Sequence, residues 1–246
     1  YFGRNVARME SSDFIHWSEP ELVLAGDSQD PDSFQINSMP VDVYEGLYIG
    51  IMEVDVRPLP DARRPIQLAV SRTGRHWTRV ANRCPFLEGP TPGAWDADQG
   101  TKPNGFVRPA AGLFIHEDQV RMYYCNSSGR DPVSGVGLAT WRRDGFVSLH
   151  AGSDGGELLS RAFIPTGPEL HLNLDASQGE VTVRVGDFQG RPLKGWKIDK
   201  PSEVIRGDQL DTVVRWAASD FDQRIGKATT VRIKLQNADL YSFWTV

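Results

Sequence analysis

The stretch SSDFIHWS at residues 11–18 returns sixty positions later as SRTGRHWT at residues 71–78. A serine, a histidine and a tryptophan recur in the same order, and a hydroxyl residue follows each tryptophan, Trp17 and Trp77. A fixed period of this size is typical of repeat architectures, in which each repeat is one supersecondary unit. We therefore expect the two phrases to close two equivalent structural units.

The units that these phrases close are predicted to be four-stranded sheets. Strand–turn–strand patterns occur in MPVDVYEGLYIGIMEV (39–54) and AAGLFIHEDQVRMYYCNS (110–127). A third strand follows each hairpin, in PIQLAVSRTGRHW (65–77) and GVGLATWRRDGF (135–146), before a tight turn and an outer strand. In the turn, Asp can accept a hydrogen bond from its own backbone, and Gly can adopt a positive φ. We expect the tryptophan to fill the gap between neighbouring sheets. Such units predict blades of a β-propeller.

The opening segment NVARMESSDFIHW (5–17) is the same closing phrase without its hairpin. Residues 1–154 therefore predict two whole blades and the tail of another, whereas a closed ring needs at least four blades. We expect the ring to be incomplete in this chain. The missing blades would come from an upstream part of a longer chain or from a second polypeptide.

Residues 155–246 show a different pattern of apolar and polar residues. Segments such as ELHLNLDA, GEVTVRVGD, TTVRIKLQN and DLYSFWTV alternate apolar and polar residues with period two, and Gly, Asp and Pro are frequent between them. Closely spaced strands of this kind predict an antiparallel β-sandwich or jelly roll. Because no stretch shows the periodicity of an amphipathic helix, the fold class is predicted to be all-β.

Composition and charge exclude several classes of function. The net charge of −5 and the scattered Lys and Arg argue against a nucleic-acid partner or an anionic membrane surface, and no apolar run approaches a spanning helix. The histidines lack ligand spacing, so no metal site is predicted, and no Gly-rich cofactor motif opens a helix. Cys84 and Cys125 are read as two buried free thiols, with a disulfide or a reactive thiol as alternatives.

Five phrases carry a resemblance to a known family. The chain resembles glycoside hydrolases of the invertase and levanase group, which are related to arabinanases and xylosidases and consist of a five-bladed β-propeller followed by a β-sandwich. The phrases are VARMESSDFIHWSEPELVL (6–24), YEGLYIGIMEV (44–54), IQLAVSRTGRHWTR (66–79), GLATWRRDGFVSLHAG (137–152) and GKATTVRIKLQNADLYSF (226–243).

The resemblance implies a bacterial, carbohydrate-active protein, often secreted or periplasmic, of which this chain would be a C-terminal portion. It implies hydrolysis of a terminal furanoside, of fructosyl or arabinosyl type, or of a related glycosidic bond in an oligo- or polysaccharide.

The chain departs from the family at its catalytic motifs. The Asn-Asp-Pro-type nucleophile segment is absent, and no Glu-Cys acid motif occurs. Arg130-Asp131-Pro132 spells the family's Arg-Asp-Pro motif but falls in an outer loop, where it is read as a turn. The catalytic residues have to be sought elsewhere.

Glycoside hydrolysis needs two carboxyl groups that flank the scissile bond. In the loop GPTPGAWDADQG (89–100), Asp96 and Asp98 follow Trp95 and are candidate catalytic residues, with turn formation as the alternative. Glu53 is the third candidate: it shares a strand face with Asp55, and the two could form a catalytic pair. Its alternative is a solvated strand end that faces Arg57 and Arg63.

Five residues are candidates for substrate binding. Trp95 offers a flat ring for a sugar face, and the segment DPDSFQINSM (30–39) offers polar side chains for sugar hydroxyls. Arg108 can orient a carboxylate in the funnel, with plain surface solvation as the alternative. The candidates are Trp95, Asp32, Gln35, Asn37 and Arg108.

Two hypotheses from different classes follow. The first is a glycoside hydrolase whose catalytic funnel is partly encoded here. The second is a non-catalytic carbohydrate-binding or structural module that completes a larger assembly.

Overall fold

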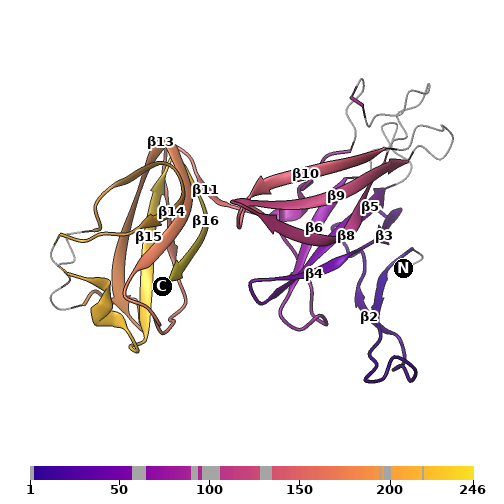
Figure 1. The fold of residues 1–246 in the computed structure, drawn as a ribbon, viewed down its shortest axis with the longest axis horizontal. Coiled ribbons are helices and arrows are strands. Elements are labelled where there is room, and N and C mark those ends of the chain that lie inside the picture. The colour runs from indigo at the N-terminus through magenta and orange to yellow at the C-terminus, as the bar shows by residue number, and fades with distance from the viewer. Residues whose placement is uncertain are drawn as a thin grey trace. The chain divides into compact units, whose positions relative to one another are not determined.

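The computed structural model describes residues 3–56, 65–89, 94–95, 106–127, 135–193, 196, 201–217 and 219–246. The chain divides into two compact units, Tyr1–Trp141 and Arg142–Val246 (Figure 1). The described residues form strands and two short 3₁₀ turns, with no α-helix among them. The predicted all-β fold class is confirmed.

The described residues of the first unit form ten strands in three sheets. Its strands are β1 (Val6–Arg8), β2 (Glu21–Leu24), β3 (Phe34–Ser38), β4 (Val41–Tyr44), β5 (Leu47–Val56), β6 (Ile66–Ser71), β7 (Thr78–Arg79), β8 (Phe106–His116), β9 (Gln119–Ser127) and β10 (Val136–Arg142).

In the second unit, the part of the chain that the structure describes forms six strands and a 3₁₀ turn, η2 (Phe221–Arg224). Its strands are β11 (Leu149–Ala151), β12 (Gly156–Leu159), β13 (Leu170–Asp187), β14 (Ile205–Val213), β15 (Thr229–Gln236) and β16 (Ala238–Thr245).

The first predicted blade forms a five-stranded antiparallel sheet: four strands follow the order β3-β5-β6-β7, and β4 continues β3 along the same edge of β5. The hairpin between β4 and β5 turns at Glu45 and Gly46, which have φ values of 45° and 75°. Positive φ at both central residues suits the right-handed twist of the flanking strands. The predicted hairpin and third strand are therefore confirmed.

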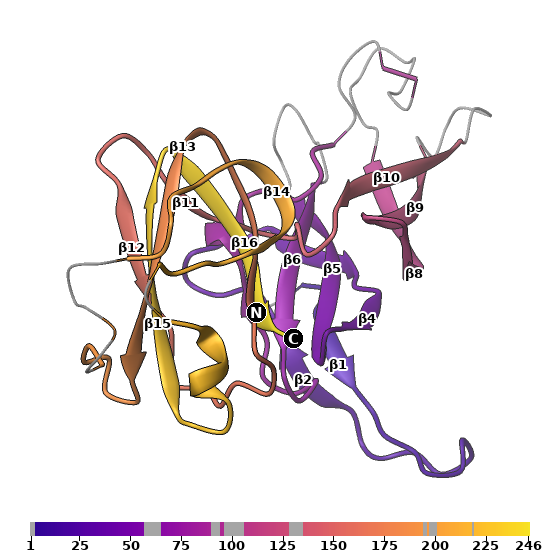
Figure 2. The same ribbon diagram turned by 60° about the vertical axis from the view of Figure 1, so that its left-hand side comes forward.

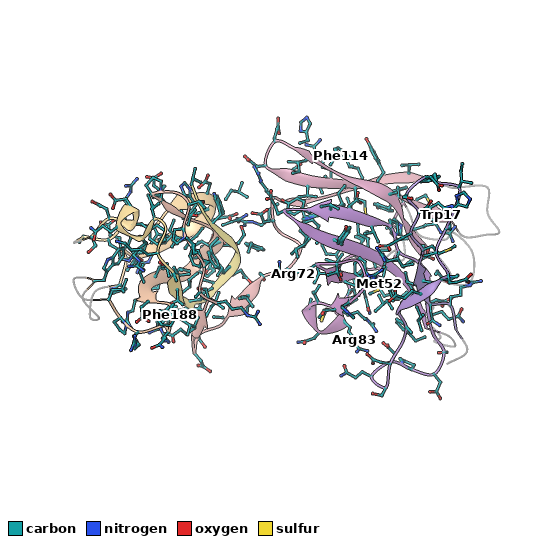
Figure 3. All side chains as sticks on the ribbon, turned by 90° about the horizontal axis from the view of Figure 1, so that it is seen from below. Trp17, Met52, Arg72, Arg83, Phe114 and Phe188 are labelled. Carbon is teal, nitrogen blue, oxygen red and sulfur yellow. The ribbon has the colours of Figure 1, made fainter. Side chains whose placement is uncertain are left out.

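The two faces of this sheet are buried differently. Period two along β5 places Met52 and Val54 on one face, where they form a core with Phe34, Ile36 and Ala69 (Met52 in Figure 3). The opposite face contacts β8 and carries a second row of buried residues. That row consists of Ile49, Ile51, Ile66 and Leu68, followed by Glu53 and Asp55.

The repeated phrase forms the same turn in both places. Ser11 Oγ accepts a hydrogen bond from the backbone N–H of Phe14 at 2.8 Å, and Ser71 Oγ accepts one from Gly74 at 2.9 Å. Phe14 and Gly74 both have a left-handed backbone, with φ values of 64° and 72°. The serine is thus the residue that closes each turn, which explains why the phrase recurs.

The two tryptophans of the phrase are not equivalent. Trp77 packs against the Met52 core and lies over Gly50, where a Cβ atom would be 2.9 Å from its ring. Trp17 is 46% exposed and contacts Phe14 edge-on at 5.1 Å between ring centroids (Figure 3). The expectation that both rings plug a gap between sheets is wrong for Trp17 within this chain.

This difference predicts unequal stability losses. Trp77→Ala removes a packed ring and is expected to lower the free energy of unfolding by about 3 kcal/mol. Trp17→Ala removes an exposed ring and one aromatic contact, so a loss of about 1 kcal/mol is expected. Urea unfolding of the two variants would measure both values. Equal losses would contradict the difference in burial.

The second predicted blade has three strands, in the order β10-β9-β8. The outer strand that we expect after β10 is missing from this sheet because β11 pairs with β16 in the second unit. The segment that contains Arg142 and Asp144, just before β11, also forms hydrogen bonds with other residues of the second unit. Arg142 donates hydrogen bonds to Asn173 at 2.6 Å and to Asp208 at 2.7 Å, and Asp144 accepts one from Ser242. The prediction of a fourth strand in this blade is therefore wrong.

The sheet of the second unit is organised around the long strand β13 (Figure 2). Its first half pairs with β16 and its second half with β15, while β14 pairs along its other edge. The two segments predicted as separate strands, ELHLNLDA and GEVTVRVGD, are thus one continuous strand. The core of this unit consists mainly of Leu170, Leu172, Leu174, Val181, Val183, Val231, Ile233 and Leu235.

Gly179 lies where β13 passes from one partner strand to the other. A Cβ atom here would be 1.8 Å from the carbonyl oxygen of Gln236, which belongs to the backbone and cannot rotate away. We expect Gly179→Ala to lower the free energy of unfolding of this unit by about 2–3 kcal/mol. The matched variant Gly152→Ala, whose Cβ would meet no atom within 4 Å, should stay within about 0.5 kcal/mol in the same denaturation measurement. Equal losses for the two variants would contradict the close approach at Gly179.

A cluster of charged side chains fastens the loop after β2 to the outer strand β7. Arg79 Nη1 donates to both carboxylate oxygens of Asp30 at 2.7 Å, and the two side chains are only 6% and 5% exposed. Arg83 donates to Asp27 at 2.5 Å. This hydrogen bond is the main cause that lowers the pKa of Asp27 to about 2.

Candidate functional site

The candidate site lies at the end of the apolar row on β5. Glu53 and Asp55 are 0% and 1% exposed and share the face that carries Ile49 and Ile51. The alternative of a solvated strand end is therefore wrong for both carboxyl groups. Arg57 and Arg63, their expected partners in that alternative, lie outside the described residues.

Side chains from two other strands surround the carboxyl group of Glu53. Ser38 of β3 donates from Oγ to Oε2 at 3.1 Å, and Asn37 donates from Nδ2 to Oε1 at 3.4 Å. Arg108 of β8 donates from Nε to Oε2 at 3.2 Å. A buried acidic residue needs such partners, since its desolvation is otherwise costly. The structure thus brings Glu53, Asn37 and Arg108 together, as three of the residues selected from the sequence.

Arg108 links this buried group to solvent. Its side chain is 51% exposed, whereas its partner Glu53 is fully buried. The alternative that Arg108 is simply solvated at the surface describes only part of its side chain, because its Nε atom donates a hydrogen bond to Glu53. A ligand that reached Arg108 from solvent would therefore meet a guanidinium group already oriented by a carboxyl group.

Gln35 lies one step further along the same pair of strands. It is directly opposite Asp55 in the register of β3 and β5, and its side chain is partly buried. Asn37 in turn accepts a hydrogen bond from Arg4 Nη1 at 2.6 Å. A row of polar residues therefore follows the β3 edge of the sheet beside Glu53 and Asp55.

The other candidates are distributed differently. Asp32 is exposed in the turn before β3, and no hydrogen bond or ion pair among the described residues joins it to Glu53. Trp95 is 56% exposed, and its ring centroid is 6.1 Å from that of Tyr124 on β9. Asp96 and Asp98 lie outside the described residues.

Sequence reasoning missed Ser38 and Arg4. The register of β3 and β5 shifts between Ile36 and Ser38, and this bulge brings Ser38 opposite Glu53. A bulge re-aims a side chain without a marked change of composition. No signal in the sequence indicates the shift.

Three further findings concern other classes of site. The described part of the chain contains no group of three or more His, Cys, Asp or Glu side chains arranged to hold a metal ion. Within the same residues, no helix has the length and hydrophobicity needed to cross a membrane. Cys84 is exposed and Cys125 is partly buried, and both are free thiols, so burial of both, as expected from the sequence, is wrong for Cys84.

Comparison with known proteins adds little about the site. No protein-family model matches the sequence, and no characterised protein matches it. Among solved structures, the chain is similar to the Bombyx mori GH32 beta-fructofuranosidase BmSUC1, with 10% sequence identity and a TM-score of 0.34. The likeness covers 94% of this chain and 70% of that chain. At this TM-score it carries no argument about the reaction.

Proposed function

We propose that this chain forms part of a glycoside hydrolase-like protein that cleaves a terminal furanoside or a related glycosidic bond. The observation that carries the proposal is the carboxyl group of Glu53, which is buried at the end of β5 and surrounded by donors from β3 and β8. Burial of an acidic residue costs free energy of folding. A gain in stability therefore does not explain why Glu53 is buried in a network that reaches solvent through Arg108.

In this proposal, Glu53 supplies one of the two carboxyl groups that glycoside hydrolysis needs. The second comes from Asp96 or Asp98, which follow the exposed ring of Trp95 in the sequence. One carboxyl group protonates the leaving oxygen, while the other attacks the anomeric carbon or activates a water molecule. Asp55 is assigned no step in this proposal.

The same proposal assigns binding roles to the polar residues around Glu53. Arg108 and Asn37 would hydrogen-bond sugar hydroxyls, since both already contact Glu53 and neither is fully buried. Gln35 and Asp32 extend this row toward the start of β3. Trp95 would offer its exposed ring to the apolar face of a sugar.

Hydrolysis assays would test the proposal directly. The purified protein, in whatever assembly it forms, would be incubated with sucrose, levan and p-nitrophenyl α-L-arabinofuranoside. The expected result is release of a monosaccharide from at least one furanoside, with p-nitrophenyl β-D-glucopyranoside as the control that stays intact. Absence of hydrolysis of every furanoside by a folded protein of known assembly state would reject the catalytic proposal.

A second candidate function is a non-catalytic module that completes a larger assembly. One face of the β8–β10 sheet favours it, because Val136, Leu138 and Tyr123 are 73%, 44% and 50% exposed there. Tyr123 also stacks on Phe114, which belongs to the same sheet and is labelled in Figure 3. Exposed apolar groups of this kind are typical of a surface that another sheet covers. The missing blades, from an upstream segment or a second polypeptide, would be its partner.

Denatured and native masses of the same preparation, with the hydrolysis assay beside them, would separate the two candidates. A longer chain or a second polypeptide in a native species that hydrolyses a furanoside would support the catalytic function, and the same assembly without activity would support the non-catalytic module. A lone chain of 27.4 kDa in both measurements would contradict the partner that the module requires.

A further inference from the structure

A polar pocket on the first unit is separate from the Glu53 site. It has a volume of about 370 Å³, within the usual range of about 300–1,000 Å³ for small-molecule sites. Its lining includes Trp77, Arg79, Asn82, Asp27 and Gln29. Because Trp77 lies over Gly50, the pocket belongs to the face of β5 opposite Ile51 and Glu53.

The backbone beside the pocket adopts an uncommon conformation. The three consecutive residues Ala81, Asn82 and Arg83 have φ values of 52°, 49° and 65°. Left-handed backbone costs free energy for residues other than glycine, although asparagine tolerates it best. A run of three such residues marks a segment whose shape the surrounding structure imposes, and strain of this kind tends to occur at ligand sites. Here it places Asn82 and Arg83 in the pocket wall.

One donor in the pocket wall has no partner. The side chain of Arg79 is 6% exposed, and its Nη1 and Nη2 atoms donate to Asp30 and Gln67. Its Nε atom is buried and has no hydrogen-bond partner among the described residues. A buried N–H without a partner is costly for the folded state. Because this atom is closed to solvent, the contacts with a ligand are assigned to the other polar groups of the lining.

The charges of the cluster decide between two classes of ligand. Arg79 and Arg83 carry two positive charges, and Asp27 and Asp30, which bind them, carry two negative charges. The net charge of these four groups is therefore zero, which offers no attraction to a phosphate or carboxylate. A neutral polyhydroxy ligand suits the pocket better, because each hydroxyl both accepts from a guanidinium or amide N–H and donates to a carboxylate or amide oxygen.

We propose that this pocket is a second carbohydrate-binding site, which takes one neutral sugar unit on the face of the blade opposite Glu53. Asp27, Gln29, Asn82 and Arg83 hydrogen-bond the hydroxyls, and the ring of Trp77 forms the apolar part of the wall. The proposal does not require the protein to hydrolyse anything. It applies to either candidate function.

Binding measurements with a catalytically altered protein would test the site. Isothermal titration calorimetry of the Glu53→Gln protein would use sucrose, D-fructose, L-arabinose and D-xylose, with inorganic phosphate as the anionic probe. We expect saturable binding of at least one sugar and none of phosphate. Since Glu53 is altered in every sample, this binding stays measurable whether or not the proposed hydrolysis is correct.

Two asparagine variants would locate the binding. Asn82→Gly removes the pocket amide while keeping a residue that adopts positive φ, and it is expected to weaken sugar binding about five-fold, as for loss of one hydrogen bond. Asn237→Gly is the matched control, since Asn237 also has a left-handed backbone, with a φ of 43°, but lies in the β15–β16 turn. It should leave affinity unchanged.

Three outcomes would overturn the proposal. They are the failure of all four sugars to bind, tighter binding of phosphate than of any sugar, and equal affinities for the Asn82→Gly protein and its parent. Loss of activity by the Glu53→Gln protein with sugar binding retained would instead show that the two sites are independent.

Discussion

Replacement of Arg79 by methionine is expected to lower the free energy of unfolding of the first unit by about 3–5 kcal/mol. The substitution keeps most of the apolar stem but removes the Nη1 atom that donates to both oxygens of the buried Asp30 carboxylate, which is 5% exposed and keeps only the longer ion pair to Arg83 at 3.0 Å among the described contacts. It also removes the guanidinium group from the ring of Phe34, which lies 4.6 Å from it. Chemical denaturation followed by circular dichroism would measure the loss.

An exposed ion pair of the same unit provides the control. Arg75 contacts Glu10 and Glu21 at 3.2 and 3.3 Å, with about half of its side chain exposed. Because water and salt screen such pairs, Arg75→Met should cost at most about 1 kcal/mol. A double variant, Arg79→Met with Asp30→Leu, should recover most of the stability because no buried charge is left alone. A loss for Arg79→Met as small as that for Arg75→Met would show that the buried pair does not fasten the loop.

Glu53→Gln is expected to lower kcat/KM for the hydrolysed furanoside by about 10²–10⁴-fold. The substitution preserves shape and still allows Ser38 and Arg108 to donate to the amide oxygen. It removes a group that can ionise and exchange a proton. The measurement is the initial rate over a range of substrate concentrations, with a thermal unfolding curve to confirm that the protein is folded.

The matched control for this prediction is Glu45→Gln, which makes the same chemical change in the exposed hairpin turn between β4 and β5. It should leave the kinetic constants unchanged. If Glu53→Gln also retained full activity, Glu53 would be a structural group, and the carboxyl pair would have to come from Asp96 and Asp98. Variants of those two residues would then be the next to assay.

The surroundings of Glu53 show which features of the candidate site can be predicted from the sequence. Period two on one strand places Glu53 and Asp55 on the same face, and this relation holds in the structure. Their burial could not be predicted, because it depends on β8, which begins fifty-three residues after Glu53 and brings Arg108 to it. The contact of Ser38 depends on a bulge that shifts the register of β3 against β5.

The repeated phrase shows most clearly which features the local sequence determines and which features depend on the tertiary structure. The sequence by itself determined the local turns: Ser11 and Ser71 close them with hydrogen bonds over three residues, and such short-range contacts are encoded by neighbouring residues. It also determined the all-β class, through period-two alternation. Only the tertiary structure decided that Trp77 is packed over Gly50 while Trp17 stays exposed. It also decided that the strand after the third turn joins another sheet, because β11 finds its partner in β16, far along the chain. Burial and strand pairing depend on which distant parts of the chain come into contact. A short local sequence does not specify those contacts.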